Sequence, residues 1–453
     1  MSGPQTQHAR PYAQQLLQDL GVATSLADAA EVHPAQAWAE SGNMALTGDP
    51  DGPGLMCPVP LASYADGILR ALAALAPGAP LAGIDGGRLL SERAALSGYR
   101  RGGAVAPGGS CRLLRAQGGW LALNLARTSD WELLPAWLEA GALADWAAVA
   151  REVCSHPVAA CVGRGRLLGL PVAALEPDGE PDGEPAGRWF EEHFRCEGAP
   201  GAAPRAPLVL DLSALWAGPL CTHLLQLMGA RVIKVESLGR PDGMRAAAHG
   251  FYDLLNAGKE SVALDFADRA ALQQLRRLIA RADIVIEASR PRALHQLGIH
   301  AEELLAAHPQ LTWVSISGYG RSGPGAQWVA FGDDGAVAGG LSQVMLECSG
   351  RALFCGDAIA DPLTGMHAAL AAWGSYRQGG GRLLALALRD VVAHGVRFAG
   401  LQDRGALRAR CEEWTRRVAS SPVVLPQPRA ITASARPSGA DTQAVLAELA
   451  RAG

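Results

Sequence analysis

The chain has 453 residues, of which 49% are hydrophobic and 19% charged, which excludes disorder throughout and allows packed cores. Its 40 basic and 44 acidic residues give a formal net charge of −4, and the absence of a basic block argues against a nucleic-acid binder. No apolar stretch reaches the roughly 20 residues of a membrane span, and the first residues lack the pattern of a signal peptide. We therefore expect a cytoplasmic protein without a membrane partner, with roughly two to four domains.

The cysteines give no indication of a metal site. Nine cysteines are scattered along the chain without a CxxC pair. The closest grouping, Cys154 with His156 and Cys161, lacks the second cluster that a zinc site needs. We expect reduced thiols and no bound metal.

The first 175 residues have an irregular pattern. Ala62–Leu75 is predicted to be a helix, Cys111–Ala126 a hairpin, and Trp131–Leu138 and Asp145–Val153 further helices. Residues 176–205 are rich in proline, glycine and acidic residues, a composition typical of a linker. The chain is thus predicted to divide into residues 1–175 and 206–453.

After this linker, short apolar strands alternate with helices. The predicted strands are Leu208–Leu212, Arg231–Glu236, Ser261–Phe266, Asp283–Glu287 and Thr312–Ser317, and the predicted helices include Gly218–Met228, Arg269–Ala282 and a terminal Thr442–Ala452. This alternation predicts an α/β fold with a parallel sheet and right-handed crossovers. Because such sheets bind ligands beyond the carboxyl ends of their strands, we expect the chemistry in the loops there.

A faint internal repeat accompanies this pattern. Pro60–Leu75 aligns without a gap with Ala358–Trp373, and Gly67 then meets Gly365. Upstream, Gly42 meets Gly340 in the same register. Alanine-rich helices match one another easily, so both a repeat and a compositional coincidence fit.

Asp361 is the main catalytic candidate. It precedes Pro362 and a long apolar helix, a place where aspartate is a common N-cap and proline a common first residue. A helix N-terminus also favours the ionised carboxylate, which makes it available as a nucleophile. A structural cap and a nucleophile both fit. In the first copy of the repeat, Ser63 occupies this position.

The loops at the predicted ligand edge contain glycine and cations. Ser317–Pro324 is glycine-rich and lets backbone approach a bulky ligand, although a plain tight turn fits as well. Arg245, Lys259, Arg290 and Arg292 lie in or near such loops and suit the phosphates of a nucleotide-like molecule. Each alone also fits a solvated surface charge.

Taken together, five segments in order resemble the class III coenzyme A transferases, the CaiB–BaiF family. They cover residues 207–375 and read LVLDLSALWAGPLCTHLLQLMGARVIKVE, FYDLLNAGKESVALDF, ADIVIEASRPRALHQLGI, LTWVSISGYGRSGP and ADPLTGMHAALAAW. The resemblance implies the α/β fold of family III CoA-transferases, with a nucleotide-binding-like large domain built on a parallel sheet and a smaller α+β domain. It also implies transfer of CoA between carboxylic acids through an aspartyl–acyl anhydride and an aspartyl-CoA thioester.

On this resemblance, Asp361 is the nucleophile. Lys259, Arg290 and, more weakly, Arg245 fall where the family contacts CoA, and Gly318 and Gly320 would frame the loop near the thioester. Acyl-CoA and carboxylic acids are then substrates, and no permanently bound cofactor is expected.

The chain also departs from the family pattern. GGSCRLLRAQGGWLALNLARTSDWELL and RLLGLPVAAL resemble the family's small domain but precede the linker. Residues 1–175 thus resemble a degenerate copy, and residues 206–453 a large domain with the catalytic aspartate and a C-terminal tail. A homodimer and an intrachain pseudo-dimer, in which residues 100–175 cover Asp361, are both open. So are two other functions: an acyl-CoA racemase or isomerase, and a CoA-binding pseudoenzyme.

Overall fold

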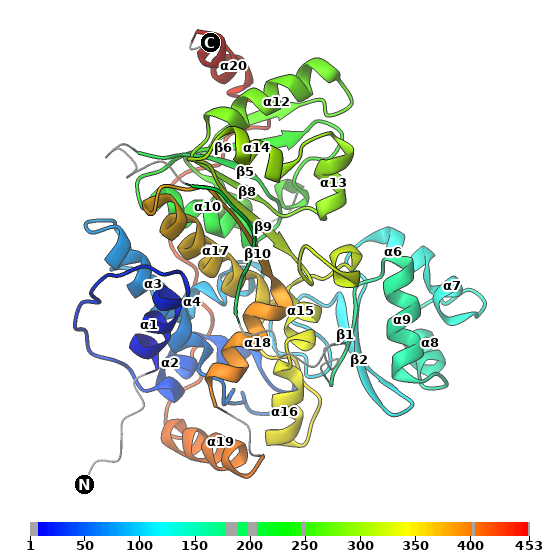
Figure 1. Ribbon diagram of the computed structural model, residues 1–453. Coiled ribbons are helices and arrows are strands. Elements are labelled where there is room, and N and C mark those ends of the chain that lie inside the picture. The colour runs from blue at the N-terminus through cyan, green and yellow to red at the C-terminus, as the bar shows by residue number, and fades with distance from the viewer. Residues whose placement is uncertain (1–7, 177–187, 198–205, 247–249, 401–403, 452–453) are drawn as a thin grey trace.

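A seven-stranded sheet forms the centre of the computed structural model, which describes residues 8–176, 188–197, 206–246, 250–400 and 404–451 (Figure 1). The strand order is β4-β10-β9-β8-β5-β6-β7. Six strands are parallel, and β4 pairs antiparallel with β10 at one edge. The strands are β4 (Glu191–Arg195), β5 (Leu208–Leu212), β6 (Arg231–Ser237), β7 (Glu260–Leu264), β8 (Ile284–Glu287), β9 (Thr312–Ser317) and β10 (Arg382–Ala387).

Both faces of this sheet are buried. Ile284 and Ile286 of β8 join one hydrophobic cluster, and Val285 between them joins another. Because both faces are covered, the strands are continuous apolar runs, and all six residues of β10 are buried. The covering helices are α10 (Ala217–Leu227) and α17 (Ala360–Arg377) on the first face, and α12 (Arg269–Arg281) and α14 (Ala301–Ala307) on the second.

The predicted α/β fold with a parallel sheet is confirmed, and the five predicted strands are present with ends that shift by at most two residues. The prediction of a linker over residues 176–205 is wrong for part of its length. Trp189 and Phe190 are buried, and β4 follows them as an edge strand. An edge strand tolerates polar side chains. Because EEHFR is mostly polar, its sequence does not show the apolar pattern that predicts a strand. Residues 177–187 and 198–205 of that segment lie outside the described residues.

Helices from the first half share a core with helix α17. These helices, at the lower left of Figure 1, pack beside α17, which is buried from Pro362 to Tyr376. The indole Nε1 of Trp373 donates to the carbonyl oxygen of Leu75 at 3.3 Å. The hydrophobic interior is therefore continuous across the predicted boundary. The helices are α1 (Ala9–Asp19), α2 (Pro34–Glu40), α3 (Leu61–Leu75), α4 (Gly86–Leu89) and α5 (Glu92–Ser97).

The aligned glycines Gly67 and Gly365 have the same packing role. A Cβ at Gly67 would lie 2.4 Å from the carbonyl oxygen of Ala9, and a Cβ at Gly365 would lie 2.4 Å from that of Ala217. Gly67 therefore lets the backbone of α1 pack directly against α3, and Gly365 lets the backbone of α10 pack directly against α17. The equivalence supports the interpretation of the pattern as a repeat.

The second aligned pair of glycines precedes a helix in each copy. Gly42, with φ 84°, precedes a 3₁₀ turn at Asn43–Leu46, and Gly340, with φ 90°, precedes α16 (Leu341–Ser349). Glycine adopts this left-handed conformation without steric cost. The two copies differ in length. In the second copy, β6 to β9 lie between α10 and α15 (Gly332–Ala338). In the first copy, no strand lies among the described residues between α1 and α2.

A smaller three-stranded antiparallel sheet lies at the right of Figure 1. The predicted hairpin forms its first two strands, and four helices pack against it. The strands are β1 (Cys111–Ala116), β2 (Gly119–Asn124) and β3 (Val172–Ala174); the helices are α6 (Thr128–Glu132), α7 (Leu134–Leu138), α8 (Trp146–Val153) and α9 (Val158–Leu168). This unit is the smaller α+β part that the fold prediction includes.

The C-terminal segment ties both parts of the chain together. Arg429 forms a two-pronged ion pair with the buried carboxylate of Glu92, and Asp441 accepts a hydrogen bond from the amide of Ser261 at 2.8 Å. The remaining C-terminal helices are α18 (Leu388–Phe398), α19 (Arg404–Val418) and α20 (Thr442–Arg451); two short helices, α11 (Phe251–Asn256) and α13 (Pro291–Gln296), follow β6 and β8.

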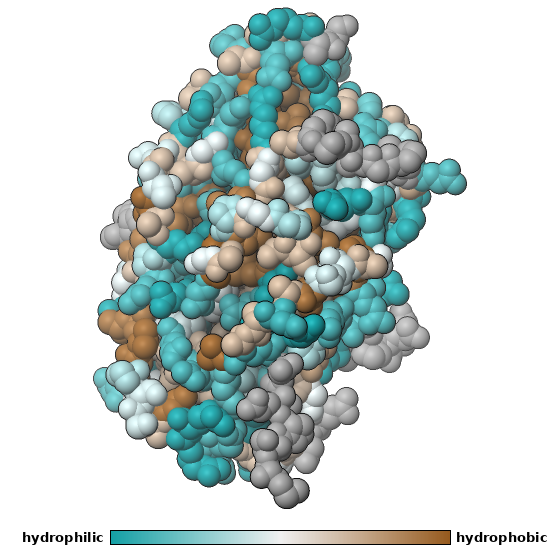
Figure 2. All heavy atoms as spheres, turned by 90° about the vertical axis from the view of Figure 1, so that its left-hand side faces the viewer, coloured by the Kyte–Doolittle hydropathy of each residue, from teal (hydrophilic) through white to brown (hydrophobic). Residues whose placement is uncertain are grey.

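The surface on the side of helices α1 to α4 is mostly polar, and apolar side chains gather near the middle of this face (Figure 2). Among the helices that the structure describes, none combines the length and the hydropathy needed to cross a membrane.

The contact at Gly67 predicts a loss of stability on substitution. Gly67→Ala places a methyl group against the carbonyl of Ala9 and should lower the free energy of unfolding by about 1–3 kcal/mol. Gly163→Ala is the matched control, because Gly163 is an exposed helical glycine with no atom within 4 Å of its would-be Cβ. The control should raise that free energy by about 0.5–1 kcal/mol. Urea unfolding of both variants measures this, and equal effects would contradict the packing role.

Candidate active site

Asp361 lies in the first turn of α17, where the predicted N-cap role is wrong. The N-cap is Ile359, and Asp361 is the second residue of the helix, with its amide donating to the carbonyl oxygen of Ala358 at 2.9 Å. Ala358 has φ 42°, a left-handed conformation that strains a non-glycine residue. This turn starts the helix two residues earlier than the sequence suggests, so the Asp361 carboxylate does not cap it.

A glycine makes room for the Asp361 carboxylate. A Cβ at Gly332 would lie 2.5 Å from Oδ2 of Asp361 and 2.3 Å from the carbonyl oxygen of Ala358. Gly332 begins α15, and its amide donates a hydrogen bond to Asp361. Any side chain at position 332 would displace the carboxylate.

Acidic side chains gather around Asp361, and an arginine from the first half faces them. Arg93, near the start of α5, donates from Nε to Oδ2 of Asp357 at 2.9 Å and from Nη2 to Oδ1 at 2.6 Å. Asp357 is completely buried. Asp333 is also buried and accepts a hydrogen bond from the amide of Ala358 at 2.8 Å. One cation therefore faces three carboxyl groups: Asp333, Asp357 and Asp361.

Burial raises the pKa of Asp361 to about 7. Arg93 lowers this pKa, whereas Asp333 and Asp357 raise it further, and the Gly332 amide lowers it. The carboxyl group is therefore only partly ionised near neutral pH, less than the helix terminus alone would favour. Desolvation and like charges outweigh the favourable effect of the helix N-terminus.

A hydrogen bond from the small sheet fixes the neighbouring Asp334. Asn124, the last residue of β2, donates from Nδ2 to Oδ1 of Asp334 at 2.9 Å, and both residues are buried. Burial raises the pKa of Asp334 to about 7, although the Asn124 hydrogen bond lowers it. Oδ1 of Asn124 and Oδ2 of Asp334 are buried without a hydrogen-bond partner. A proton on Asp334 would supply the donor that the amide oxygen of Asn124 lacks.

Comparison with known proteins finds a family that part of the chain resembles. Residues 207–422 match the family model of CoA-transferase family III. This segment, which carries Asp361, is similar to family III. The resemblance inferred from the sequence is thus confirmed for the segment that carries Asp361.

Named CoA-transferases share part of their length with this chain. It is 34% identical over 171 residues to the succinyl-CoA–D-citramalate CoA-transferase of Chloroflexus aurantiacus, which covers 36% of this chain and 42% of that protein. It is 33% identical over 202 residues to the succinate–glutarate CoA-transferase of Agrobacterium fabrum, which covers 40% and 50%. A solved CAIB/BAIF family protein from Brucella suis is 28% identical over 51% of this chain and 60% of that chain, with a TM-score of 0.39. The chain spans about half the length of the curated relatives it matches.

The structure contradicts one predicted CoA contact. Lys259 is buried beneath α10, where its Nζ donates to Oδ2 of Asp211 at 3.1 Å and to Oγ1 of Thr222 at 2.7 Å. Burial lowers the pKa of Lys259 to about 8, against the opposing effect of Asp211. The ammonium group is enclosed by protein acceptors and is not exposed at the surface.

The two other predicted cations lie on separate loops of the seven-stranded sheet. Arg245, after β6, donates from Nε to Oε1 of Glu236 at 2.9 Å, and its guanidinium lies 4.5 Å from the ring centroid of Tyr252. Arg290, after β8, is the N-cap of α13 and is exposed. β5 lies between β8 and β6, so the two arginines flank the central loop. Their contact with CoA stays a prediction.

The glycine-rich loop lies close to α15. A Cβ at Gly318 would lie 2.8 Å from Cβ of Ala330, two residues before Gly332. Gly320 has φ 102° and donates from its amide to Oγ of Ser317 at 3.0 Å. The loop is thus a tight turn that the structure places beside the start of α15. A role near the thioester stays a prediction for both glycines.

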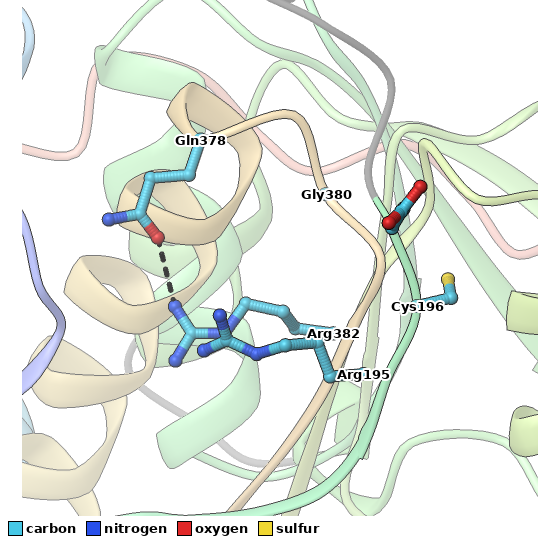
Figure 3. A pocket seen from close by; sticks show the side chains of 6 residues that line it. Arg195, Cys196, Gln378, Gly380 and Arg382 are labelled. Carbon is cyan, nitrogen blue, oxygen red and sulfur yellow. Dashed lines mark hydrogen bonds between the residues drawn. The ribbon is translucent and has the colours of Figure 1, made fainter.

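A cavity of about 380 Å³ lies away from Asp361, at the other end of α17 (Figure 3). At 1.5 Å per residue, the helix separates the two by about 25 Å. Arg195 and Arg382 lie side by side there, and both donate to Glu192, at 2.7 Å and 2.6 Å. The cavity is lined by Arg195, Cys196, Glu197, Gln378, Gly380 and Arg382. It is separate from the candidate active site.

Sequence reasoning missed Arg93, Gly332 and Asn124. Arg93 is one of 38 arginines and stands in no recognisable motif. Its ion pair with Asp357 joins residues 264 positions apart, which the sequence alone does not reveal. Gly332 stands in no recognisable motif either, and only its contact with Asp361 gives it a role.

Asp334 should make the stability of the protein depend on pH. In the folded chain its pKa is raised to about 7 from 3.8, so the folded state holds a proton that the unfolded state has released. The contribution of Asp334 to stability therefore falls as pH rises from about 4 to about 7. Asp334→Asn keeps the hydrogen bonds and cannot ionise, so it should reduce this fall.

Urea unfolding at pH 5 and pH 7 measures this effect. Asn124→Asp is the opposing variant, because it places a second carboxyl group against Asp334 and should steepen the loss of stability at higher pH. The same difference between the two pH values in wild type and Asp334→Asn would show that Asp334 does not titrate in this range.

Proposed function

We propose that the chain is an acyl-CoA:carboxylate CoA-transferase in which Asp361 is the nucleophile. The observation that carries the proposal is the position of this carboxylate: it lies in the first turn of α17, against Gly332, within the segment that matches family III. The two named relatives are CoA-transferases that their names connect with carboxylic acids. These names support the reaction class but do not identify the donor or acceptor of this chain.

The reaction begins with attack of the ionised Asp361 carboxylate on the thioester carbonyl of acyl-CoA. The C–S bond breaks, CoA thiolate leaves, and an aspartyl–acyl anhydride forms. The thiolate then attacks the aspartyl carbonyl, which releases the first carboxylic acid and leaves an aspartyl-CoA thioester. The acceptor carboxylate attacks that thioester to give a second anhydride and CoA thiolate. Attack of this thiolate on the acceptor carbonyl yields the new acyl-CoA and restores Asp361.

Only the ionised form of Asp361 is a nucleophile in this sequence. Because burial raises its pKa to about 7, the rate of adduct formation should rise with pH through neutrality and level off above it. The carboxylate of Asp361 is also partly withdrawn from water, so less solvent needs to be displaced when it attacks the thioester. Arg290 and Arg245 are the candidates for the CoA phosphates, because both lie on loops at the carboxyl edge of the sheet.

The aspartyl intermediate predicts a covalent modification at one residue. The protein, incubated with a panel of acyl-CoAs and quenched with hydroxylamine, should carry a hydroxamate at Asp361, mapped by peptide mass spectrometry. Asp361→Asn should abolish the modification while acyl-CoA binding, measured by calorimetry, changes less than about threefold. Ser63→Ala is the matched control, since Ser63 has the equivalent position in the first copy, and it should leave the modification unchanged.

Two outcomes would contradict the proposal. Binding of acyl-CoA with no modification of the wild type would indicate a CoA-binding pseudoenzyme. Incorporation of solvent deuterium at the alpha carbon of the acyl group, without an acceptor acid and without modification of Asp361, would indicate a racemase or isomerase.

A further inference from the structure

Arg93 is held firmly in its place. Its side chain is 23% exposed, and its guanidinium forms the two-pronged ion pair with Asp357. The guanidinium carbon lies 5.3 Å from the ring centroid of Trp216, in the loop after β5, and 5.8 Å from that of Tyr99. A Cβ at Gly108 would lie 3.4 Å from Nη2 of Arg93. Ion pair, rings and backbone therefore confine the guanidinium on several sides.

The helix that carries Arg93 is anchored by the adjacent residue. Glu92 is completely buried, and its carboxylate accepts hydrogen bonds from Nε and Nη2 of Arg429 at 2.6 Å and 2.9 Å. Nη1 of Arg429 is 2.9 Å from Nε2 of His223 in α10. Consecutive residues of α5 thus bind the C-terminal segment and the turn before α17. The position of Arg93 is set by parts of the chain on both sides of Asp361.

The charged groups that act most strongly on Asp361 come from three different elements. Arg93 comes from α5, Asp333 from α15, and Asp357 from the turn that precedes α17. Buried like charges repel strongly, and an opposite charge within a few ångströms reverses part of this effect. Arg93 is the cation of this cluster, and together with the Gly332 amide it offsets the two flanking carboxylates.

We propose that Arg93, supplied by the N-terminal half, is a positioning residue that acts together with Asp357 to set the charge state of the Asp361 carboxylate. The inference rests on the proposed function for its catalytic meaning, but the charge state of Asp361 is itself measurable without any substrate. Arg93 lies outside residues 207–422, the segment that matches family III. The N-terminal half thus takes part in the reaction through Arg93.

Arg93 and Asp357 act on Asp361 in opposite directions. The guanidinium of Arg93 lowers the pKa of Asp361, and the carboxylate of Asp357 raises it. Removal of Arg93 should therefore shift the pH midpoint of Asp361 upward, and neutralisation of Asp357 should shift it downward. A purely structural ion pair would behave differently, because loss of either partner breaks the same contact.

The test compares Arg93→Met with Asp357→Asn. Carbodiimide labelling of Asp361 as a function of pH, read by peptide mass spectrometry, reports its protonation without acyl-CoA, and hydroxylamine trapping with acyl-CoA gives the midpoint of the reaction. Arg93→Met should raise both midpoints by about one pH unit or more, and Asp357→Asn should lower them. Arg93→Lys keeps the charge and should leave the midpoints close to those of the wild type.

Arg70→Met is the matched control, since Arg70 also lies in the N-terminal half, is 24% exposed and pairs with Glu31 rather than with the cluster. It should leave both midpoints unchanged. If Arg93→Met does not fold, the nearly isosteric Asp357→Asn still tests the sign through the other member of the ion pair. The role of Arg93 would be overturned if Arg93→Met and Asp357→Asn shifted the pH midpoints in the same direction, or if neither variant shifted them. A wild type that is labelled but never trapped would instead refute the proposed function, and the labelling midpoints would still test Arg93.

Discussion

The ion pair between Arg93 and Asp357 is the interaction on which the arrangement around Asp361 depends. It joins residues 264 positions apart and lies in a place from which water is largely removed. Removing one partner of such a pair leaves the other as an uncompensated buried charge, at a cost of about 3–5 kcal/mol. The pair therefore holds α5 against the turn before α17, and the first half of the chain is built into the surroundings of the candidate nucleophile.

A second set of buried charges supports the sheet behind this site. The chain has two lysines, Lys234 and Lys259, and both are buried. Nζ of Lys234 lies 3.1 Å from Oδ2 of Asp242 and donates to the carbonyl oxygen of Ser213 at 2.8 Å. Burial alone would raise the pKa of Asp211, but the two ammonium groups outweigh it and lower that pKa. In a chain that otherwise uses arginine, the compact ammonium group fits where a planar guanidinium would need more space.

The parallel sheet was predictable because strands buried on both faces consist of apolar runs that the sequence displays directly. β4 was not, because its residues are polar and stand among proline and glycine, and its pairing with β10 crosses 190 positions. Asp361 was found from its segment, yet its place in the helix was not, since the left-handed Ala358 moves the helix start. Lys259 was wrongly predicted to contact CoA, because the position of a residue after a helix does not reveal whether its side chain points to the solvent or to the core. Contacts between distant segments, such as those of Arg93 and Asn124, depend on the tertiary fold alone.

The shared core of α3 and α17 also affects how the protein is made. The hydrogen bond between Leu75 and Trp373 spans 298 positions, and the apolar faces of α1 and α3 are buried against helices from the far end of the chain. At about 5–20 residues per second, a ribosome needs roughly 15–60 s to supply that partner. Contacts of such high sequence separation also slow folding, because long loops must close before the contacts form. During synthesis the nascent N-terminal helices therefore lack the partner for part of their apolar surface for tens of seconds, until α17 emerges.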